Sequence, residues 1–438
     1  MEKVRLTIER LDEKGRGVAT YRGKPVYVTY ALPGDEVEAE IVYYNRRRGE
    51  YIARLREVVS GGEGRVKPRC RHFGQCGGCM FQNWDYQMQL RFKRWVVEQA
   101  LRRWGVDGVV ADVVPSPTIW YYRNRMDYAI SHDGKVGLKE YGSWSRIHDL
   151  SECYLLSPEA VEVIAATREF MRRRGVPGWD LVRHEGFLRY VVIREGKFTG
   201  DRLVNIVTYQ GQFRYLDELV SELSSRGRAT GVIWGINPTI TDVSVARDLR
   251  PIWGKDHLTE KVRSITFHVH PNAFFQTNSY MVPRLVEEVV KGAEGGRRAA
   301  DLYSGVGLFS VFLSEAFDEV VGVEAEEAAV YSANITLEWN GISNVRYVAG
   351  RVEEAAAMVG EADTVVIDPP RPGMSTKAIR AVKSISPKRI VYVSCNPDSM
   401  MRDISMFKGY RLAGPVQPLD MFPHTPHVEL VAVLEKSR

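Results

Sequence analysis

Four chemically active features are spread over the last third of the chain. A thiol, Cys395, and a carboxylate, Asp368, each follow an apolar run that is typical of a buried strand. A second carboxylate, Glu429, precedes the final apolar run at 430–434, and a glycine-containing turn covers 301–307. Because the carboxyl ends of parallel strands meet at one edge of a sheet, these groups can belong to one site.

The turn Asp301-Leu-Tyr-Ser-Gly305-Val-Gly307 is typical of a nucleotide-like ligand site between a strand and a helix. Its glycines let a ligand approach the backbone, and Glu324, at the end of the next strand, can hold two ribose hydroxyls. Ser310 stands where a dinucleotide fingerprint has its third glycine. The pattern therefore favours an adenosyl ligand without pyrophosphate, such as S-adenosylmethionine, over a dinucleotide.

The thiol and the two carboxylates can carry out chemistry on a pyrimidine. Asp368 ends the segment Val365-Val-Ile-Asp-Pro-Pro-Arg371 and can accept a hydrogen bond from N3–H of an imide such as uracil. Cys395 lies at a strand end near a helix N-terminus, which predicts a lowered pKa and a nucleophilic role. Glu429 can act as a general base.

Together these features match one reaction. Uracil C5 is a poor nucleophile until a thiolate adds to C6, after which C5 can take a methyl group and a base must remove the C5 proton. An NAD-dependent oxidoreductase on the same sheet is an alternative, but it has no need of the thiol and Glu429. A cytosine-C5 methyltransferase usually has Pro-Cys at its nucleophile, whereas Ser394 precedes Cys395 here.

Two further polar segments flank this region. The segment 274–278, Phe-Phe-Gln-Thr-Asn, offers amides such as Gln276 that can read a base edge and aromatic rings that can stack. His424 and His427 suggest a metal site, but the neighbouring prolines make the spacing irregular and no third ligand is near. We therefore expect no metal at these histidines.

The other four of the five cysteines form a separate motif. Cys70, Cys76 and Cys79 lie in a glycine-rich loop, and Cys153 follows much later. Four thiolates suit an iron–sulfur cluster or tetrahedral zinc, although a zinc ribbon usually has two C-x2-C pairs. Either group would join the N-terminal part to the middle of the chain.

The positive charge is concentrated near the N-terminus. The chain of 438 residues has a net charge of +5, and residues 1–110 hold 21 Lys/Arg against 14 Asp/Glu. Arg46–Arg48 and the run Arg65–Arg71 are the candidates for binding a polyanion. A solvated basic surface is the alternative. No signal peptide or membrane span is visible, which predicts a cytoplasmic protein without a membrane partner.

Three patterns predict the elements that carry these residues. Residues 1–60 contain short strands separated by turns, typical of an OB-like barrel, and a basic amphipathic helix covers 84–104. The middle of the chain is strand-rich, with helices near 158–174 and 214–226. From about 266, strands and helices alternate, which predicts an α/β fold with a doubly wound, Rossmann-like sheet. The expected strands of that sheet are 298–303, 319–324, 364–368, 389–394 and 430–434.

The motifs D-L-Y-S-G-V-G, D-P-P-R, V-S-C-N-P and H-V-E, in this order, resemble those of the S-adenosylmethionine-dependent RNA uridine-C5 methyltransferase family. The resemblance spans nearly the whole chain. It implies an N-terminal TRAM domain, a [4Fe–4S] cluster on Cys70, Cys76, Cys79 and Cys153, Cys395 as nucleophile and Glu429 as base. The residues that it places around the donor and the uracil are Gln276, Tyr303, Gly305, Gly307, Glu324 and Asp368. The chain departs from the family pattern at Leu308 and Arg351.

The combined interpretation divides the chain into three domains. These are a TRAM barrel at 1–60, a mixed α+β central domain with the cluster at 61–82 and 120–265, and a methyltransferase domain at 83–119 and 266–438. The expected substrate is an unpaired or flipped uridine in RNA. A composition poor in Gln and rich in Arg hints at a thermophile and favours tRNA uridine 54 over a 23S rRNA loop. A non-catalytic RNA-binding iron–sulfur protein remains the alternative from another class, and no obligate protein partner is evident.

Overall fold

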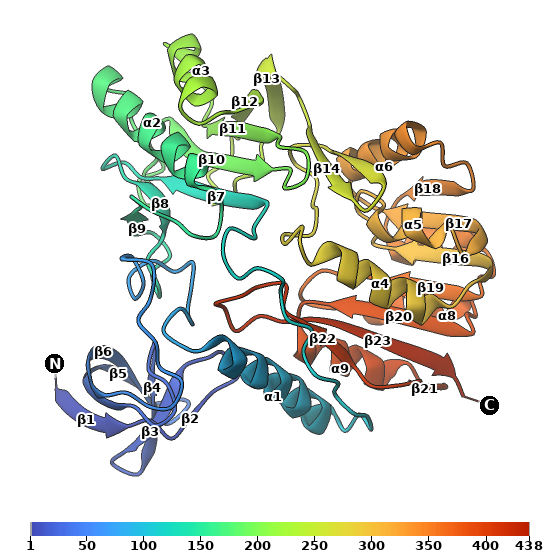
Figure 1. Cartoon of the computed structure of the whole chain (residues 1–438), viewed down its shortest axis with the longest axis horizontal. Helices are drawn as coiled ribbons and strands as arrows, with labels where there is room; N and C mark the ends of the chain where they lie inside the picture. The colour runs from blue at the N-terminus through green and yellow to red at the C-terminus, as the bar shows by residue number, and fades with distance from the viewer. Residues whose placement is uncertain (1, 438) are drawn as a thin grey trace.

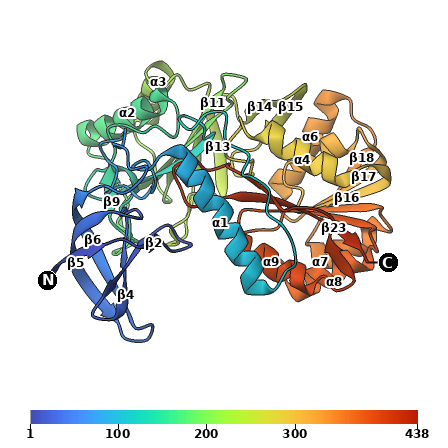
Figure 2. The same cartoon turned by 60° about the horizontal axis from the view of Figure 1, so that its bottom comes forward.

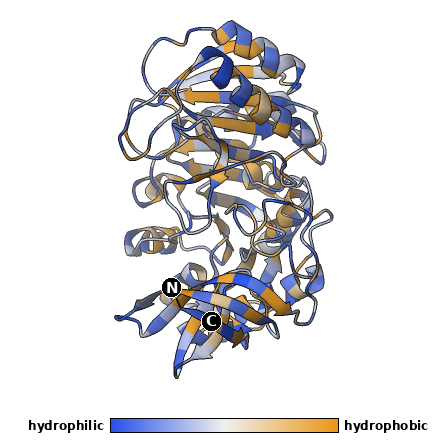
Figure 3. Ribbon diagram, turned by 90° about the vertical axis from the view of Figure 1, so that its left-hand side faces the viewer, coloured by the Kyte–Doolittle hydropathy of each residue, from blue (hydrophilic) through white to orange (hydrophobic). Residues whose placement is uncertain are grey.

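The structure, a computed structural model, describes residues 2–437 and is built around three sheets (Figure 1). A six-stranded N-terminal sheet, a seven-stranded central sheet and a larger C-terminal sheet follow one another along the chain. Among these residues, no helix combines the length and the hydrophobicity needed to cross a bilayer. Figure 3 shows hydrophobic residues concentrated on the strands, whereas the helices carry residues of both kinds, as expected for elements with one buried face.

The N-terminal sheet confirms the predicted strands and adds a short one. Its order is β1-β5-β6-β4-β3-β2, and it encloses a small core that includes Leu6, Val26, Val28 and Val37. The extra strand, β2, has only two residues, too few for an alternating pattern to be visible in the sequence. The strands of this sheet, called the barrel below, are β1 Lys3–Thr7, β2 Arg10–Leu11, β3 Gly17–Tyr21, β4 Lys24–Val28, β5 Glu36–Asn45 and β6 Glu50–Ser60.

Helix α1, Tyr86–Trp104, lies where the sequence predicts a basic amphipathic helix. The Asp85 carboxylate caps its first turn by accepting from the backbone N–H of Gln87 at 2.9 Å, and Gly105 ends it with φ 60°. The helix crosses the molecule and packs against α9 of the C-terminal domain (Figure 2). The segment after the barrel therefore contributes to the C-terminal half of the structure.

The central sheet has the order β13-β12-β11-β10-β7-β8-β9 and is covered by two helices, as the mixed pattern predicts. Helix α2, Pro158–Arg174, and helix α3, Leu216–Ser225, match the expected ranges closely. The strands are β7 Arg125–Ile130, β8 Val136–Lys139, β9 Ile147–Asp149, β10 Leu188–Glu195, β11 Arg202–Thr208, β12 Gly231–Ile236 and β13 Asp248–Gly254. A separate hairpin follows, with strands β14 Leu258–Val262 and β15 Ile265–Val269.

The C-terminal sheet has the order β18-β17-β16-β19-β20-β23-β21, with β22 also paired to β23. Its strands are β16 Gly296–Leu302, β17 Phe317–Glu324, β18 Val345–Ala349, β19 Thr364–Ile367, β20 Arg389–Ser394, β21 Tyr410–Leu412, β22 Gln417–Leu419 and β23 Glu429–Lys436. The helices are α4 Val282–Ala293, α5 Leu308–Leu313, α6 Glu327–Asn340, α7 Val352–Val359, α8 Thr376–Ser384 and α9 Pro397–Met406. The predicted α/β fold is therefore confirmed.

Both faces of this sheet are buried because side chains alternate along each strand. In β16, Ala300 and Leu302 belong to the core beneath α1, α7, α8 and α9, whereas Ala299 belongs to the core beneath α4, α5 and α6. In β20, Tyr392 belongs to the first of these cores and Val393 belongs to the second. Figure 2 shows α4 and α6 on one side of the strands and α7, α8 and α9 on the other.

The direction in which successive strands are added to the sheet reverses between the neighbouring strands β16 and β19. Strands β17 and β18 extend the sheet on one side of β16, and β19, β20 and β23 extend it on the other. In open α/β sheets, ligands bind outside the carboxyl ends of the strands at such a reversal. The fold therefore predicts the position of the site before any side chain is considered.

A buried ion pair joins α1 to the segment that leads into β23. The ammonium group of Lys93 contacts the carboxylate of Asp420, and both side chains are fully buried. The same ammonium donates to the backbone carbonyl of Phe422 at 2.9 Å. Burial lowers the pKa of Lys93 in spite of the attraction of Asp420. This pair fixes the segment before Glu429 to a helix more than 300 residues earlier in the chain.

We expect Lys93→Met to destabilise the protein strongly, because it leaves the Asp420 carboxylate buried without its partner. The loss should be about 3–5 kcal/mol in the free energy of unfolding, measured by chemical denaturation. The matched control is the double variant Lys93→Met/Asp420→Leu, which removes both charges and should recover much of this loss. A single variant as stable as the unmodified protein would contradict the role of the pair.

Candidate active site

The strand register brings the predicted nucleophile and the predicted base to the same edge of the C-terminal sheet. Strand β23 runs antiparallel to β20, and Ser394 pairs with Leu430. Cys395, the residue after Ser394, therefore lies beside Glu429, the first residue of β23. Asp368 follows β19, the parallel neighbour of β20, and reaches the same edge. The structure thus brings together three groups that are up to 61 residues apart in the sequence.

These groups influence one another's ionisation. Burial, with the charge of Asp301, raises the pKa of Asp368 to about 7, and the amide of Gln276 opposes this by donating to Asp368 at 3.1 Å. Burial and the Asp368 charge raise the pKa of Glu429 well above its usual value. The side chain of Glu429 is almost completely buried. Both carboxyl groups are therefore biased towards their neutral forms in the ligand-free protein.

The structure contradicts the expected low pKa of Cys395. Burial, followed by the charges of Glu429 and Asp368, raises the pKa of this thiol to about 12, although Arg371 acts in the opposite direction. The expectation rested on the start of α9, which does lie two residues after the cysteine. Burial, the largest cause, acts with the two carboxyl groups, which are distant in the sequence, against any effect of that helix end. Cys395 is consequently a protonated thiol in the ligand-free protein.

The predicted ligand-binding turn connects β16 to α5. The buried carboxylate of Asp301 accepts from the backbone N–H of Ser310 at 2.8 Å and from its hydroxyl at 2.6 Å. Gly307 has φ 83°, and a side chain there would meet the hydroxyl of Tyr347 at 2.0 Å. Tyr303 also has a positive φ, 66°, which is a strained conformation for a tyrosine. The Asp301 carboxylate therefore holds the two ends of the turn together, because it joins the end of β16 to α5.

A small crevice lies above this turn and contains most of the predicted donor-binding residues. It is lined by Phe274, Phe275, Gln276, Tyr303, Ser304, Gly305, Val306, Leu308, Phe309 and Asp368. Glu324 lies at the adjoining end of β17, where its carboxylate accepts from the backbone N–H of Gly305 at 2.8 Å. Leu308 is the buried first residue of α5, and Arg351 is an exposed residue at the start of α7.

The crevice fits an adenosyl ligand in three respects. The hydroxyl of Ser304 is buried and has no hydrogen-bond partner in the part of the chain that the structure describes, so a bound ligand could satisfy it. The ring of Phe274 is 60% exposed, an unusual state for a phenylalanine, and it could cover a flat heterocycle. The acidic Glu324 beside Gly305 suits ribose hydroxyls, as predicted.

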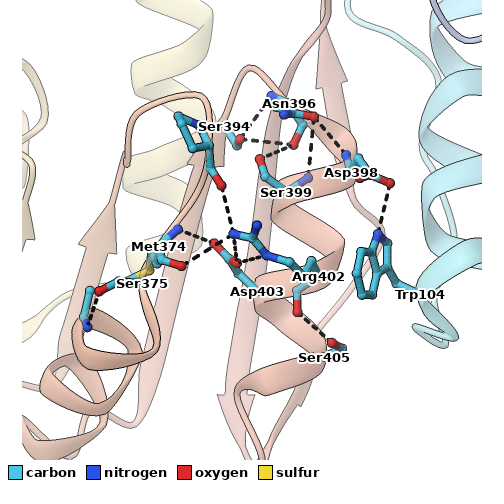
Figure 4. Close-up of polar contacts among 12 residues, drawn as sticks. Trp104, Met374, Ser375, Ser394, Asn396, Asp398, Ser399, Arg402, Asp403 and Ser405 are labelled. Atoms are coloured by element: carbon cyan, nitrogen blue, oxygen red, sulfur yellow. Dashed lines mark hydrogen bonds and ion pairs between the residues drawn. The ribbon is translucent and has the colours of Figure 1, made fainter.

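A polar network holds the backbone around Cys395 (Figure 4). The side-chain oxygen of Asn396 caps α9 by accepting from the backbone N–H of Asp398 at 3.1 Å, and its amide nitrogen donates to the carbonyl of Arg371 at 3.0 Å. The hydroxyl of Ser399 donates to the same carbonyl at 3.1 Å. The segment after Cys395 and the segment after Asp368 are therefore bound to each other.

A second centre of this network is Asp403, which is fully buried in α9. Its carboxylate accepts from the backbone N–H of Met374 and from the hydroxyl of Tyr392, each at 2.6 Å. Arg402 also pairs with this carboxylate and donates to the carbonyl of Pro372 at 2.9 Å. Figure 4 shows this cluster beneath the Ser394–Asn396 segment. Asp403 thus anchors α9, β20 and the 372–374 loop together.

A large cavity of about 830 Å³ opens in front of Cys395. Its wall is formed by the barrel turn at 13–14, the cysteine loop at 77–80, α1, the first strands of the central sheet, and the segments 395–398 and 425–428. The cavity is therefore bounded by all three parts of the molecule. Its size and its position suit a substrate that is larger than a free base.

The four remaining cysteines meet at a separate, smaller cavity. Cys70, Cys76, Cys79 and Cys153 all line it, and all are free thiols. Burial raises the pKa of Cys70 to about 11 and that of Cys76 to about 12. Among residues 2–437, no three His, Cys, Asp or Glu side chains converge closely enough to hold one metal ion. The four cysteines therefore line one cavity, and the structure does not identify the group that they would bind.

The histidines near the C-terminus have structural contacts. His424 is buried and stacks on Trp120 with ring centroids 4.0 Å apart, and its carbonyl accepts from the backbone N–H groups of Met80 and Phe81. His427 lies 3.5 Å from the Arg371 guanidinium, and burial together with that charge lowers the pKa of His427 to about 4. These contacts hold the 423–428 segment against the first half of the chain.

Some functional contacts were not predicted from the sequence. Arg371 was recognised only as part of a motif, yet it lines the cavity and acts on the pKa of Cys395. Asn396 could have been identified, because Asn followed by Pro is the usual start of a helix. Asp403 has no such signal, because its partners come from three separate elements.

Comparison with known proteins identifies relatives over the full length. Residues 2–50 match the model of the TRAM domain, and residues 243–437 match that of the tRNA (Uracil-5-)-methyltransferase family. The chain is 38% identical over 435 residues to a tRNA (uracil(54)-C(5))-methyltransferase of Pyrococcus horikoshii, covering 98% of this chain and 100% of the relative. It is 41% identical to an uncharacterised RNA methyltransferase of Nanoarchaeum equitans, with 99% and 94% of the two chains covered.

A solved structure has the same architecture. It is the tRNA (uracil-54, C5)-methyltransferase of Pyrococcus abyssi in complex with S-adenosyl-L-homocysteine. The TM-score is 0.84 at 35% sequence identity, and the match covers 98% of this chain and 99% of that one. The likeness therefore extends over the barrel, the central sheet and the C-terminal sheet.

Proposed function

The chain belongs to the tRNA (uracil-5-)-methyltransferase family, and from this premise we propose that it methylates C5 of uridine 54 in tRNA. It is an S-adenosylmethionine-dependent RNA uracil-C5 methyltransferase. The observation that carries the proposal is the convergence of Cys395, Asp368 and Glu429 between the donor crevice and the large cavity. The choice of tRNA follows from the names of the full-length relatives.

In the proposed reaction, Cys395 is the nucleophile. Its thiolate forms a bond to C6 of the uracil, which moves the electrons of the C5–C6 double bond into an enolate. When bound, S-adenosylmethionine supplies the methyl group: the C5–CH3 bond would form as the S–CH3 bond breaks, and the sulfur leaves as neutral S-adenosylhomocysteine. Glu429 then removes the C5 proton, the double bond forms again, and the C6–S bond breaks to release Cys395.

Asp368 holds the uracil during these steps. Its carboxylate accepts a hydrogen bond from N3–H, which cytosine lacks, and it thereby selects uracil. Gln276, which donates to Asp368 in the ligand-free protein, keeps the carboxylate oriented towards the site. Around the donor, Tyr303, Gly305, Gly307 and Glu324 bind the adenosyl part.

The high pKa of Cys395 sets an order for these events. Burial, together with the charges of Glu429 and Asp368 when these groups are ionised, opposes a free thiolate, so the thiol proton passes to water in the cavity as the C6–S bond forms and the negative charge moves to the uracil. Transfer of the methyl group from the positively charged sulfur then neutralises the enolate. With that charge gone, Glu429 can release its own proton to water and, as a carboxylate, accept the C5 proton at the stage when a base is needed.

The barrel and the cavity are suited to hold the RNA around the target. The TRAM match covers the barrel, and Arg46–Arg48 lie exposed in the turn between β5 and β6. Such cations bind phosphates with little sequence preference. Because stacking hides C5 and C6 inside a helix, the uridine must enter the cavity unpaired or flipped out.

We propose that Cys70, Cys76, Cys79 and Cys153 hold a [4Fe–4S] cluster with a structural role. Each thiolate of such a cluster binds a different iron, so the four sulfurs lie further apart than around one zinc ion. This is consistent with four cysteines that share one cavity but do not converge on one point. The backbone N–H of Gly78 donates to the sulfur of Cys76 at 3.4 Å, a contact that stabilises a bound thiolate.

Methyl transfer to RNA tests the proposed reaction. We expect tritium from labelled S-adenosylmethionine to enter an unmodified tRNA transcript at uridine 54. Cys395→Ala should reduce this incorporation to background, because no sulfur is left to activate C5. Glu429→Gln should instead accumulate an RNA–protein adduct that survives denaturation, because the C5 proton stays in place. Incorporation only into a 23S rRNA fragment would overturn the choice of tRNA.

The pH dependence of kcat/KM tests the role of Asp368. With a pKa of about 7, this group becomes an ionised acceptor for N3–H as the pH rises through neutrality. We therefore expect kcat/KM for RNA to rise with pH, and the rise to become less steep above about pH 7. Asp368→Asn, which cannot titrate, should lack this change of slope. An unchanged profile in the variant would contradict the role.

Metal analysis tests the cluster. Protein purified without oxygen should contain iron and acid-labile sulfide in equal amounts, as a [4Fe–4S] cluster requires. Cys153→Ser should lose most of both, whereas Cys395→Ser should keep them, because Cys395 lies in the other cavity. Zinc without sulfide would favour a single-ion site instead.

A further inference from the structure

An exposed tryptophan belongs to a loop that lines the large cavity, and it has no role in the reaction described above. Trp144 is 65% exposed, the second-highest exposure among the large hydrophobic side chains that the structure presents to solvent. It belongs to the loop 140–146 between β8 and β9. Glu140, Tyr141 and Gly142 of the same loop line the cavity that contains Cys395. Trp144 follows the last of these lining residues by two positions, and the next residues, Ser145 and Arg146, line a separate neighbouring cavity.

The loop that carries Trp144 is held in shape by its own hydrogen bonds. The backbone N–H of Glu140 donates to the carbonyl of Arg146 at 2.9 Å, and that of Ser143 donates to the carbonyl of Glu140 at 3.0 Å. The Arg146 guanidinium also pairs with the Glu140 carboxylate at 2.6 Å. An exposed ring on such a loop loses little conformational freedom when a partner binds to it.

The base of the loop is attached to the cysteine loop and to the barrel. The backbone N–H of Gly77 donates to the carbonyl of Lys139 at 2.9 Å, and that of Tyr141 donates to the carbonyl of Gln75 at 3.1 Å. The ring of Tyr141 packs edge-on against Tyr30 of the barrel, with centroids 5.5 Å apart. The position of Trp144 is therefore fixed relative to the parts of the molecule that surround the substrate.

The charges on the cavity wall favour a polyanionic partner. Among the acidic wall residues, Glu13 and Asp398 share Arg103, whereas Asp127 pairs with Arg125 and Glu140 with Arg146, so three arginines face four acids. By contrast, three cations on the wall have no carboxylate partner within residues 2–437, namely Lys14, Arg123 and Arg371. The charge left uncompensated on the wall is thus positive, as a phosphate backbone requires.

We propose that Trp144 stacks on an unpaired base of the RNA substrate next to the uridine that enters the cavity. An aromatic ring binds any base through its flat face, and Trp offers the largest face. When the uridine leaves the RNA stack, the base next to it loses a stacking partner. The Trp144 ring would take the place of that partner. The inference rests on the proposed function, because it takes RNA as the occupant of the cavity.

Binding measurements with the full-length protein and its bound cluster test this role without relying on catalysis. At a fixed salt concentration, Trp144→Ala should weaken binding of an unmodified tRNA transcript roughly 5- to 100-fold, the range expected for the loss of one base–aromatic stack. Trp144→Phe should recover most of the affinity. Trp253, 44% exposed on β13, a strand that contributes no residue to the cavity wall, provides the matched control, and Trp253→Ala should bind as the unmodified protein does.

A second RNA distinguishes stacking from a general effect on the protein. Duplex RNA of equal length, without unpaired bases, should bind Trp144→Ala and the unmodified protein equally well. Methyl transfer at saturating tRNA and the KM for S-adenosylmethionine should change less than about threefold in Trp144→Ala, because the ring does not contact the reacting atoms.

Unchanged tRNA affinity in Trp144→Ala, or an equal loss for duplex RNA or in Trp253→Ala, would overturn the inference. The first of these results would assign the exposed ring to a different kind of partner, such as a protein. Absence of methyl transfer by the unmodified protein would instead refute the proposed function, and this result is independent of the affinity comparison.

Discussion

The mutual repulsion of acidic groups at one edge of the C-terminal sheet is the constraint on which the site depends. Burial raises the pKa of Asp301, Asp368 and Glu429, and the charge of Asp301 raises that of Asp368 further, as the charge of Asp368 does for Glu429. Such groups do not all carry charge at once in a poorly solvated place. The ligand-free site is therefore held largely neutral, and ionisation has to follow the arrival of positive charge or the loss of negative charge during the reaction.

A neutral, crowded site needs a rigid support, and contacts between distant parts of the chain provide it. Lys93 and Asp420 fix the segment before Glu429, and Asp403 joins α9 to the loop that follows Asp368. Both interactions are buried, so water competes little with them. The N-terminal helix α1 thus has a part in the geometry of the C-terminal sheet, although the barrel and the central sheet have their own cores.

The sequence predicts the fold well where neighbouring residues form a repeating hydrophobic pattern. It predicts the site well where a polar motif directly follows an apolar strand. The alternation of strands and helices predicted the doubly wound sheet, and the amphipathic pattern at 84–104 predicted α1. The ionisation of Cys395 could not be predicted in this way. It depends on Glu429, which becomes a neighbour only through the register of β20 and β23. Likewise, Trp144 is one of nine tryptophans in the sequence, and only the fold shows that it is exposed on a loop that lines the cavity.

The donor crevice and the large cavity have no lining residue in common. Asp368 lies in the crevice and Cys395 lies in the cavity, so a uracil held by both residues reaches from the cavity to the edge of the crevice. Apart from Asp368, the residues that contact the donor and those that contact the RNA belong to separate sets. Substitutions can therefore change the affinity for the small molecule and the affinity for the nucleic acid independently.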